Sequence, residues 1–145
     1  MNTAQDVINY ALEMNRRGIN HGTSGNVSIR HENGFLVTPS GLDYDVLTPE
    51  KIVFVDLEGN FQGPLKPSSE WLFHRDIYLN RPEINAVIHT HSKYATALAC
   101  LRQDLPSFHY MVAIAGGKNV RCAPYAPFGT QELSEVALIA LKDRN

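Results

Sequence analysis

The sequence predicts a layered α/β domain with a mixed, largely antiparallel sheet. Segments with the apolar spacing of helices interleave with short runs that alternate as strands do. The strand-like runs are short and joined by hairpin-type turns, which favours antiparallel pairing over a fully parallel sheet. The 145 residues, 43% of them hydrophobic, are enough for one domain with an ordinary core.

The first half of the chain predicts a helix followed by a hairpin and a third strand. Thr3 is placed to cap the helix and Gly18 to end it. A glycine-rich loop at 21–26 then leads into the strands, which are expected at residues 27–30, 35–39 and 52–56.

The second half alternates helices with strands. A helix is expected to start just after Pro67 and to end before Pro82, because its apolar residues recur at helical spacing. The later elements are a strand at 85–91, a helix at 92–101, a mixed apolar segment at 107–117, a short strand at 119–126, and a final helix from Thr130 that is cut short at Asn145.

Composition excludes several classes of function. The formal net charge is -2 and no basic cluster exceeds residues 15–17, so no nucleic-acid partner is expected. The apolar stretches fall far short of the roughly 20 residues that a membrane span needs, and the N-terminus does not resemble a signal peptide. We therefore expect a cytoplasmic protein without a membrane partner, in which Cys100 and Cys122 are buried and reduced.

Two histidines follow the apolar run at 85–88. Residues i and i+2 of a strand point to the same face, so His89 and His91 can reach one point in space. They are either a metal-binding pair or two hydrogen-bonded histidines at a strand end.

Glu70 is the simplest third ligand. It begins the helix that precedes the histidine strand, and consecutive elements usually pack together. A glutamate there can also serve only as a favourable charge in a first helical turn. His74, one turn later, could form a rival metal pair with Glu70, although its neighbours favour a half-buried packing position.

Three small polar segments complete the pattern, at residues 23–26, 38–41 and 67–70. They offer backbone N–H groups, hydroxyls and an amide, and the third stands at a helix N-terminus, which suits a phosphate. Each segment alone can be an ordinary turn.

Five motifs in this order resemble the class II aldolase and adducin family: GTSGNVS, VTPSG, KPSSEW, HTH and HYMVAIAGG. The resemblance covers essentially the whole chain and implies a three-layer α/β/α fold in a single domain, residues 1–145. It also implies that Glu70 is a zinc ligand and general acid/base and that His89 and His91 are zinc ligands. Tyr110 is implied as a catalytic residue that reaches a neighbouring subunit's site, and thus a homotetramer. The implied phosphate pocket consists of Asn26, Ser40, Gly41, Ser68 and Ser69.

The activity that the resemblance implies is zinc-dependent cleavage of a phosphorylated ketose, L-fuculose 1-phosphate, to dihydroxyacetone phosphate and L-lactaldehyde. A sugar-phosphate 4-epimerase or a dehydratase on the same scaffold is the enzymatic alternative, and a non-catalytic adducin-like interaction module is the other. In the family a third histidine ligand lies just beyond the segment that ends this chain. The chain is therefore either a truncated copy of a longer domain that lacks its C-terminal part or a natural remnant with an incomplete site, and a final helical pattern without a capping glycine favours truncation.

Overall fold

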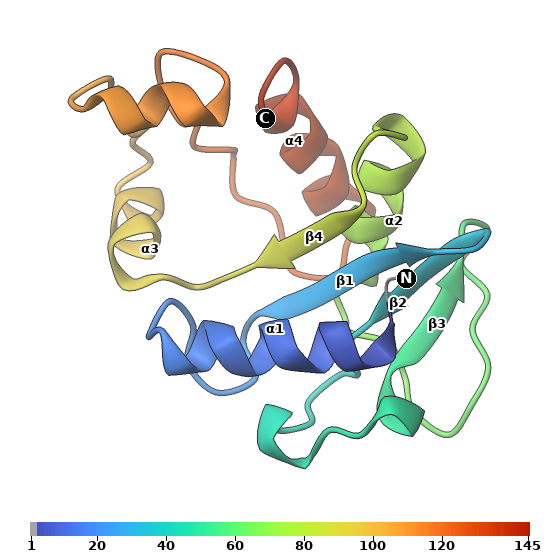
Figure 1. Ribbon diagram of the computed structural model, residues 1–145. Coiled ribbons are helices and arrows are strands. Elements are labelled where there is room, and N and C mark those ends of the chain that lie inside the picture. The colour runs from blue at the N-terminus through green and yellow to red at the C-terminus, as the bar shows by residue number, and fades with distance from the viewer. Residues whose placement is uncertain (1–2) are drawn as a thin grey trace.

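The computed structural model describes residues 3–145 as a small sheet with helices on both sides (Figure 1). The strands are β1 (Asn26–His31), β2 (Gly34–Val37), β3 (Val53–Asp56) and β4 (Ala86–His89). The helices are α1 (Ala4–Arg16), α2 (Trp71–Asn80), α3 (Lys93–Cys100) and α4 (Gln131–Leu141). Short 3-10 helices add η1 (Tyr44–Val46), η2 (Pro49–Lys51) and η3 (Tyr110–Ala115).

The sheet has the strand order β3-β2-β1-β4, and each neighbouring pair is antiparallel. The α/β class is therefore confirmed, with a sheet that is antiparallel throughout its four described strands. The register matters for the site, because β1 pairs Asn26 with His89. The start of β1 and the end of β4 thus lie side by side.

Three layers follow from the alternation of side chains along the strands. On one face, Val27 and Ile29 of β1 pack with the apolar stripe of α1 in a first core cluster. On the other face, Phe35 and Val37 of β2 pack against Tyr78 of α2 in a second cluster. Helix α4 packs on α2 and extends that outer layer (Figure 1).

Polar side chains cap the N-termini of the first and last helices. Thr3 caps α1 in a capping box with Asp6, as its position predicts. Thr130 caps α4 through the backbone N–H of Leu133. None of the helices in residues 3–145 is long and apolar enough to cross a membrane.

Two expectations for the C-terminal third are wrong. Residues 119–126 form no strand, only an isolated bridge between Leu105 and Val120, because none of the described strands lies beside them to form a ladder. The final helix ends at Leu141 and does not run on to Asn145. The Arg121 guanidinium donates hydrogen bonds to the carbonyls at the end of this helix and so caps its C-terminus.

The expectation of buried cysteines is also wrong. Cys100 and Cys122 are free thiols, as expected, but Cys100 is exposed and Cys122 is only half-buried. Helix α3 has no buried residue within the described chain, since no other element covers it. In Figure 1, α3 and the segment around η3 stand away from the sheet.

Candidate metal centre

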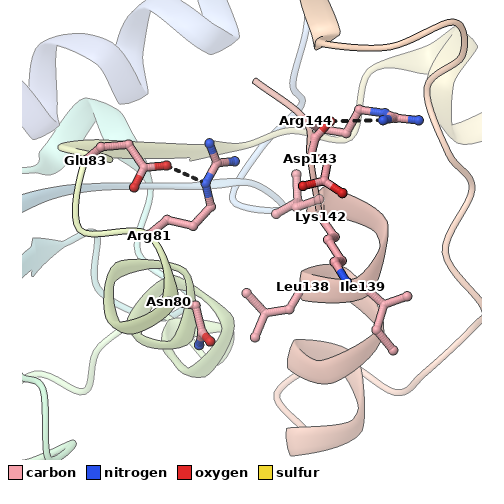
Figure 2. Close-up of a pocket in the computed structure, with 9 residues that line it drawn as sticks. Asn80, Arg81, Glu83, Leu138, Ile139, Lys142, Asp143 and Arg144 are labelled. Carbon is pink, nitrogen blue, oxygen red and sulfur yellow. Dashed lines mark hydrogen bonds and ion pairs between the residues drawn. The ribbon is translucent and has the colours of Figure 1, made fainter.

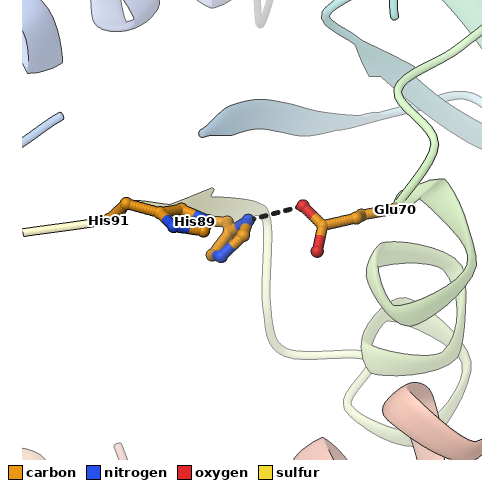
Figure 3. Close-up of side chains that lie close together, drawn as sticks. All are labelled: Glu70, His89 and His91. Atoms are coloured by element: carbon orange, nitrogen blue, oxygen red, sulfur yellow. Dashed lines mark ion pairs between the residues drawn. The ribbon is translucent and has the colours of Figure 1, made fainter. Parts of the chain in front are cut away.

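The start of α2 and the end of β4 bring three ligand-type side chains together (Figure 3). Glu70 occupies the N-cap position of α2, but its carboxylate makes no capping hydrogen bond and is free to face the sheet. His89 is the last residue of β4, and His91 follows two positions later. The sequence-predicted set of Glu70, His89 and His91 is thus assembled from two consecutive elements.

The donor atoms of these three residues lie within 4.8 Å of one another. Nδ1 of His89 is 2.9 Å from Oε2 of Glu70. The ring centroids of His89 and His91 are 4.8 Å apart. The two imidazoles therefore lie on the same side of the chain, and His91 is exposed at the rim of the cluster.

The cluster fits a metal ion on its own geometry. Nδ1 of His89 is buried and has no hydrogen-bond partner, although the Glu70 carboxylate is at hydrogen-bond distance. The contact has the length of a hydrogen bond without its direction, which leaves an orphaned buried nitrogen next to a carboxylate oxygen. Two imidazoles and one carboxylate are ligands that divalent metal sites use.

The local electrostatics favour the ligand forms of these groups. Burial alone raises the pKa of Glu70, but the contacts with His89 and Asn26 outweigh it, so the net pKa lies below its ordinary value. Burial, followed by the charge of His89, lowers the pKa of His91. An ionised carboxylate and a neutral imidazole are the states that bind a cation.

Two asparagines and a glycine hold the cluster in place. Asn26 donates from Nδ2 to Oε2 of Glu70 at 2.9 Å. Asn20 accepts the backbone N–H of His91 at 3.2 Å. Gly25 is required between them, because a Cβ there would lie 2.5 Å from the carbonyl oxygen of His89. Sequence reasoning missed Asn20, which stands in a polar loop with no distinguishing signal.

His74 does not join the cluster, so the rival metal pair with Glu70 is not formed. Its ring is fully buried, and burial lowers its pKa to about 3. Both ring nitrogens already have partners, with Ser28 at 2.7 Å from Nδ1 and Asn26 at 2.5 Å from Nε2. The helical spacing of His74 predicted a packing position but not this polar role.

The three small polar segments converge beside Glu70. The backbone N–H of Ser68 donates to the carbonyl of Thr38 at 2.9 Å, and that of Ser40 donates to the carbonyl of Lys66 at 3.0 Å. The Thr38 hydroxyl in turn accepts the N–H of Val27 at 3.3 Å. These amides are already used, so an anion here would depend on hydroxyls and the remaining donors.

The predicted phosphate residues differ in their surroundings. Ser68 is buried at the start of α2, while Ser40, Gly41 and Ser69 are exposed. Asn26 is buried, and its side chain contacts Glu70 and His74. Tyr110 lies apart from these residues on η3, with 79% of its surface exposed.

Two hollows flank the far end of the outer layer. One, of about 380 Å³, lies beside His89 and is lined mainly by apolar residues of α2, β4 and α4. The other, of about 520 Å³, opens between the C-terminal ends of α2 and α4 (Figure 2). It contains the Arg81 and Glu83 pair, 2.8 Å apart, and none of the cluster residues.

Comparisons with known proteins place this geometry in a family. Residues 5–145 match the profile of the Class II Aldolase and Adducin N-terminal domain. L-fuculose phosphate aldolase of Escherichia coli (strain K12) is 50% identical over 141 residues, which cover 97% of this chain and 66% of that protein. The 5-methylthioribulose-1-phosphate/5-deoxyribulose-1-phosphate aldolase of Rhodospirillum rubrum is 52% identical and is covered over 62% of its length, against 95% of this chain.

A solved structure of an L-fuculose 1-phosphate aldolase has the same fold. Its TM-score is 0.93 at 42% identity, with 98% of this chain and 68% of that chain covered. The chain spans about two thirds of the length of the curated relatives that it matches, at 66% and 62%. With a profile match over nearly all its residues and this structural likeness, the chain belongs to the class II aldolase and adducin family.

Proposed function

We propose that this protein is a zinc-dependent aldolase that cleaves L-fuculose 1-phosphate to dihydroxyacetone phosphate and L-lactaldehyde. The observation that carries the proposal is the convergence of Glu70, His89 and His91 beside segments rich in hydroxyls. A carboxylate and two imidazoles suit a catalytic metal, and small polar segments at a helix start suit a phosphate.

Glu70, His89 and His91 would hold the metal. A bound zinc ion would supply positive charge that polarises the ketone and the neighbouring hydroxyl of the sugar. Because the cluster is exposed on the His91 side, a substrate can approach it from solvent.

Glu70 is the proposed general acid/base. When the bond between C3 and C4 breaks, the C4 hydroxyl loses its proton and becomes the aldehyde, and the electron pair stays on the C2–C3 fragment. That fragment then takes up a proton at C3 to give dihydroxyacetone phosphate. Glu70 would take up the proton from the C4 hydroxyl and deliver it to C3, and the hydrogen bond from Asn26 would direct the carboxylate.

The phosphate would be anchored by residues that do not react. We assign this role to Asn26, Ser40, Gly41, Ser68 and Ser69. The hydroxyls of Ser40 and Ser69 lie on exposed segments next to the start of α2, where the helix dipole also favours an anion. Anchoring the distant end of the substrate holds its reacting carbon against the metal.

Tyr110 and the oligomer form part of the same proposal. The Tyr110 side chain is exposed on η3, so it can contact another copy of the chain. We propose that it reaches the site of a neighbouring subunit in a cytoplasmic homotetramer and acts there on the aldehyde end of the substrate.

The choice of ketose is tested by assaying two substrates. The names of the relatives give their substrates as L-fuculose phosphate and as 5-methylthioribulose or 5-deoxyribulose 1-phosphate. We expect aldehyde release from L-fuculose 1-phosphate that a chelator stops and zinc restores, and a lower kcat/KM for 5-deoxyribulose 1-phosphate. A higher kcat/KM for the second sugar would reassign the substrate.

Other outcomes would reassign the activity. Conversion of the sugar phosphate without carbon–carbon cleavage would point to an epimerase or a dehydratase. Absence of both turnover and zinc binding would favour a non-catalytic interaction module. Glu70→Gln is the inactive control for the turnover assay, since it removes the proposed acid/base while keeping the size of the side chain.

A further inference from the structure

A chain of buried hydrogen bonds runs behind the candidate metal centre. Starting from α2, the Tyr78 hydroxyl lies 2.7 Å from Oγ of Ser28, and this oxygen lies 2.7 Å from Nδ1 of His74. Nε2 of His74 lies 2.5 Å from Oδ1 of Asn26, whose Nδ2 donates to Glu70. The four residues behind Glu70 are at most 2% exposed.

The carboxylate of Glu70 determines the direction of every bond in this chain. An ionised carboxylate only accepts hydrogen bonds, so Asn26 must turn its NH₂ group toward Glu70 and its carbonyl toward His74. His74 must then donate from Nε2, which leaves Nδ1 to accept from the Ser28 hydroxyl. Ser28 in turn accepts from Tyr78.

The burial of His74 is consistent with this single arrangement. Its ring is 0% exposed and stacks on Phe73, with ring centroids 4.4 Å apart. Desolvation holds the pKa of His74 at about 3, so the ring is neutral near pH 7. A neutral imidazole has one donor and one acceptor nitrogen, and both are used here.

We propose that His74, supported by Ser28 and Tyr78, is a positioning residue that locks the amide of Asn26 and thereby aims the carboxylate of Glu70. This series of hydrogen bonds orients the side chains that it joins and conducts no proton, because an amide does not pass a proton from its carbonyl oxygen to its nitrogen. This inference rests on the proposed role of Glu70 as a metal ligand and extends it to residues that touch neither metal nor substrate.

Two variants and a matched control test the proposal. Ser28→Ala interrupts the series of hydrogen bonds. His74→Phe removes the two hydrogen bonds of the imidazole while keeping a ring of similar shape. Ser134→Ala is the control, because Ser134 is likewise 0% exposed but bonds to Asp76 between α2 and α4, at 2.6 Å. His74→Gln is the rescue variant, since its amide can donate to Asn26 and accept from Ser28.

The first measurement is zinc affinity of the 145-residue chain, by competition with a coloured chelator. Loss of a residue that orients a ligand typically weakens metal binding about 10- to 100-fold. We expect that loss in His74→Phe, a smaller loss in Ser28→Ala, recovery in His74→Gln, and wild-type affinity in Ser134→Ala. Equal affinities in all five proteins, with thermal stability alone reduced, would overturn the proposal.

The second measurement needs no metal. In wild type the Asn26 side-chain amide protons, followed by NMR, should exchange slowly with solvent because both ends of the amide are held. Exchange should accelerate at least about tenfold in Ser28→Ala and His74→Phe but not in Ser134→Ala, because the Asn26 amide is then held by fewer buried hydrogen bonds. Failure of wild type to bind zinc would refute the proposed function, whereas unchanged Asn26 exchange in the variants would refute this inference alone.

Discussion

The two faces of β1 are equally buried but chemically opposite. Toward α1 the strand presents Val27 and Ile29, which are 1% and 4% exposed. Toward α2 it presents Asn26 and Ser28, which are 2% and 0% exposed. Burial therefore does not distinguish the two faces. They differ in the interactions that their buried side chains need. Apolar contact suffices on the first, while the second requires a partner for every polar atom.

The polar face fixes α2 along its length. Asn26 and Ser28 bind its first two turns through His74 and Tyr78. At the other end, the Arg30 guanidinium donates to the carbonyls of Tyr78 and Ile84, each at 3.0 Å. One face of the strand thus supplies much of the core, and the other sets the position of the helix that carries Glu70.

The largest expected effect falls on the polar side. Glu70→Gln removes the proposed acid/base but keeps a side-chain oxygen that can accept the hydrogen bond from Asn26. We expect kcat to fall about 10²- to 10⁴-fold, the range for loss of a general acid/base, with little change in thermal stability. Steady-state kinetics and a melting curve on the same sample measure both. Wild-type kcat in this variant would remove Glu70 from the chemistry.

On the apolar face, Ile29→Ala should affect stability alone. Removing a buried isoleucine side chain costs about 2 to 5 kcal/mol of unfolding free energy, because it loses contacts and leaves a cavity. Urea denaturation measures the loss. Zinc affinity of the folded fraction should match wild type, and a tenfold weakening would mean that the two faces are not separable as we describe.

Its neighbour Arg30 provides the direct comparison across the strand. Arg30→Met keeps the length of the side chain but removes its hydrogen bonds to the Tyr78 carbonyl of α2 and to two carbonyls just beyond the end of that helix. Hydrogen bonds from a charged donor contribute about 1.5 to 3 kcal/mol, so a loss of that size is expected in the same denaturation experiment. Unlike Ile29→Ala, this variant should also weaken zinc binding, since α2 loses an anchor. Full zinc affinity would limit the alignment role to Asn26 and Ser28.

A smaller effect is expected from pH. The pKa of His74 is about 3 in the folded chain because the ring is buried, against about 6.5 when unfolded. Between these values the unfolded chain binds the extra proton, so stability is fully present above pH 6.5 and falls as the pH drops toward 3. The slope from His74 should approach about 1.4 kcal/mol per pH unit, and His91 adds to it with the same sign. A slope in His74→Gln as steep as in wild type would contradict this assignment.

The sequence predicted the three cluster residues because local rules suffice for them. His89 and His91 are two positions apart at a strand end, and Glu70 begins the preceding helix, so short-range geometry brings them together. The main helices and the strands before residue 90 follow from periodicity and caps for the same reason.

What the sequence could not predict depends on long-range pairing. The alternation of residues 27–30 is typical of a strand with one face in solvent, and only the packing of α2 shows that Ser28 is buried. His74 resembles a packing residue until its partners 46 and 48 positions away are known. The failed strand at 119–126 has the opposite cause, since it has apolar residues but no neighbouring strand to form a ladder with.

The most direct test of the central claim is a crystal structure of the protein grown with zinc, with anomalous scattering recorded at the zinc edge. Our account predicts one strong peak between Glu70, His89 and His91, with ligand distances of about 2.0 to 2.2 Å. The peak should disappear in the double variant His89→Ala with His91→Ala. A wild-type crystal without zinc at these residues, or with its ion held by a different set of side chains, would contradict the account.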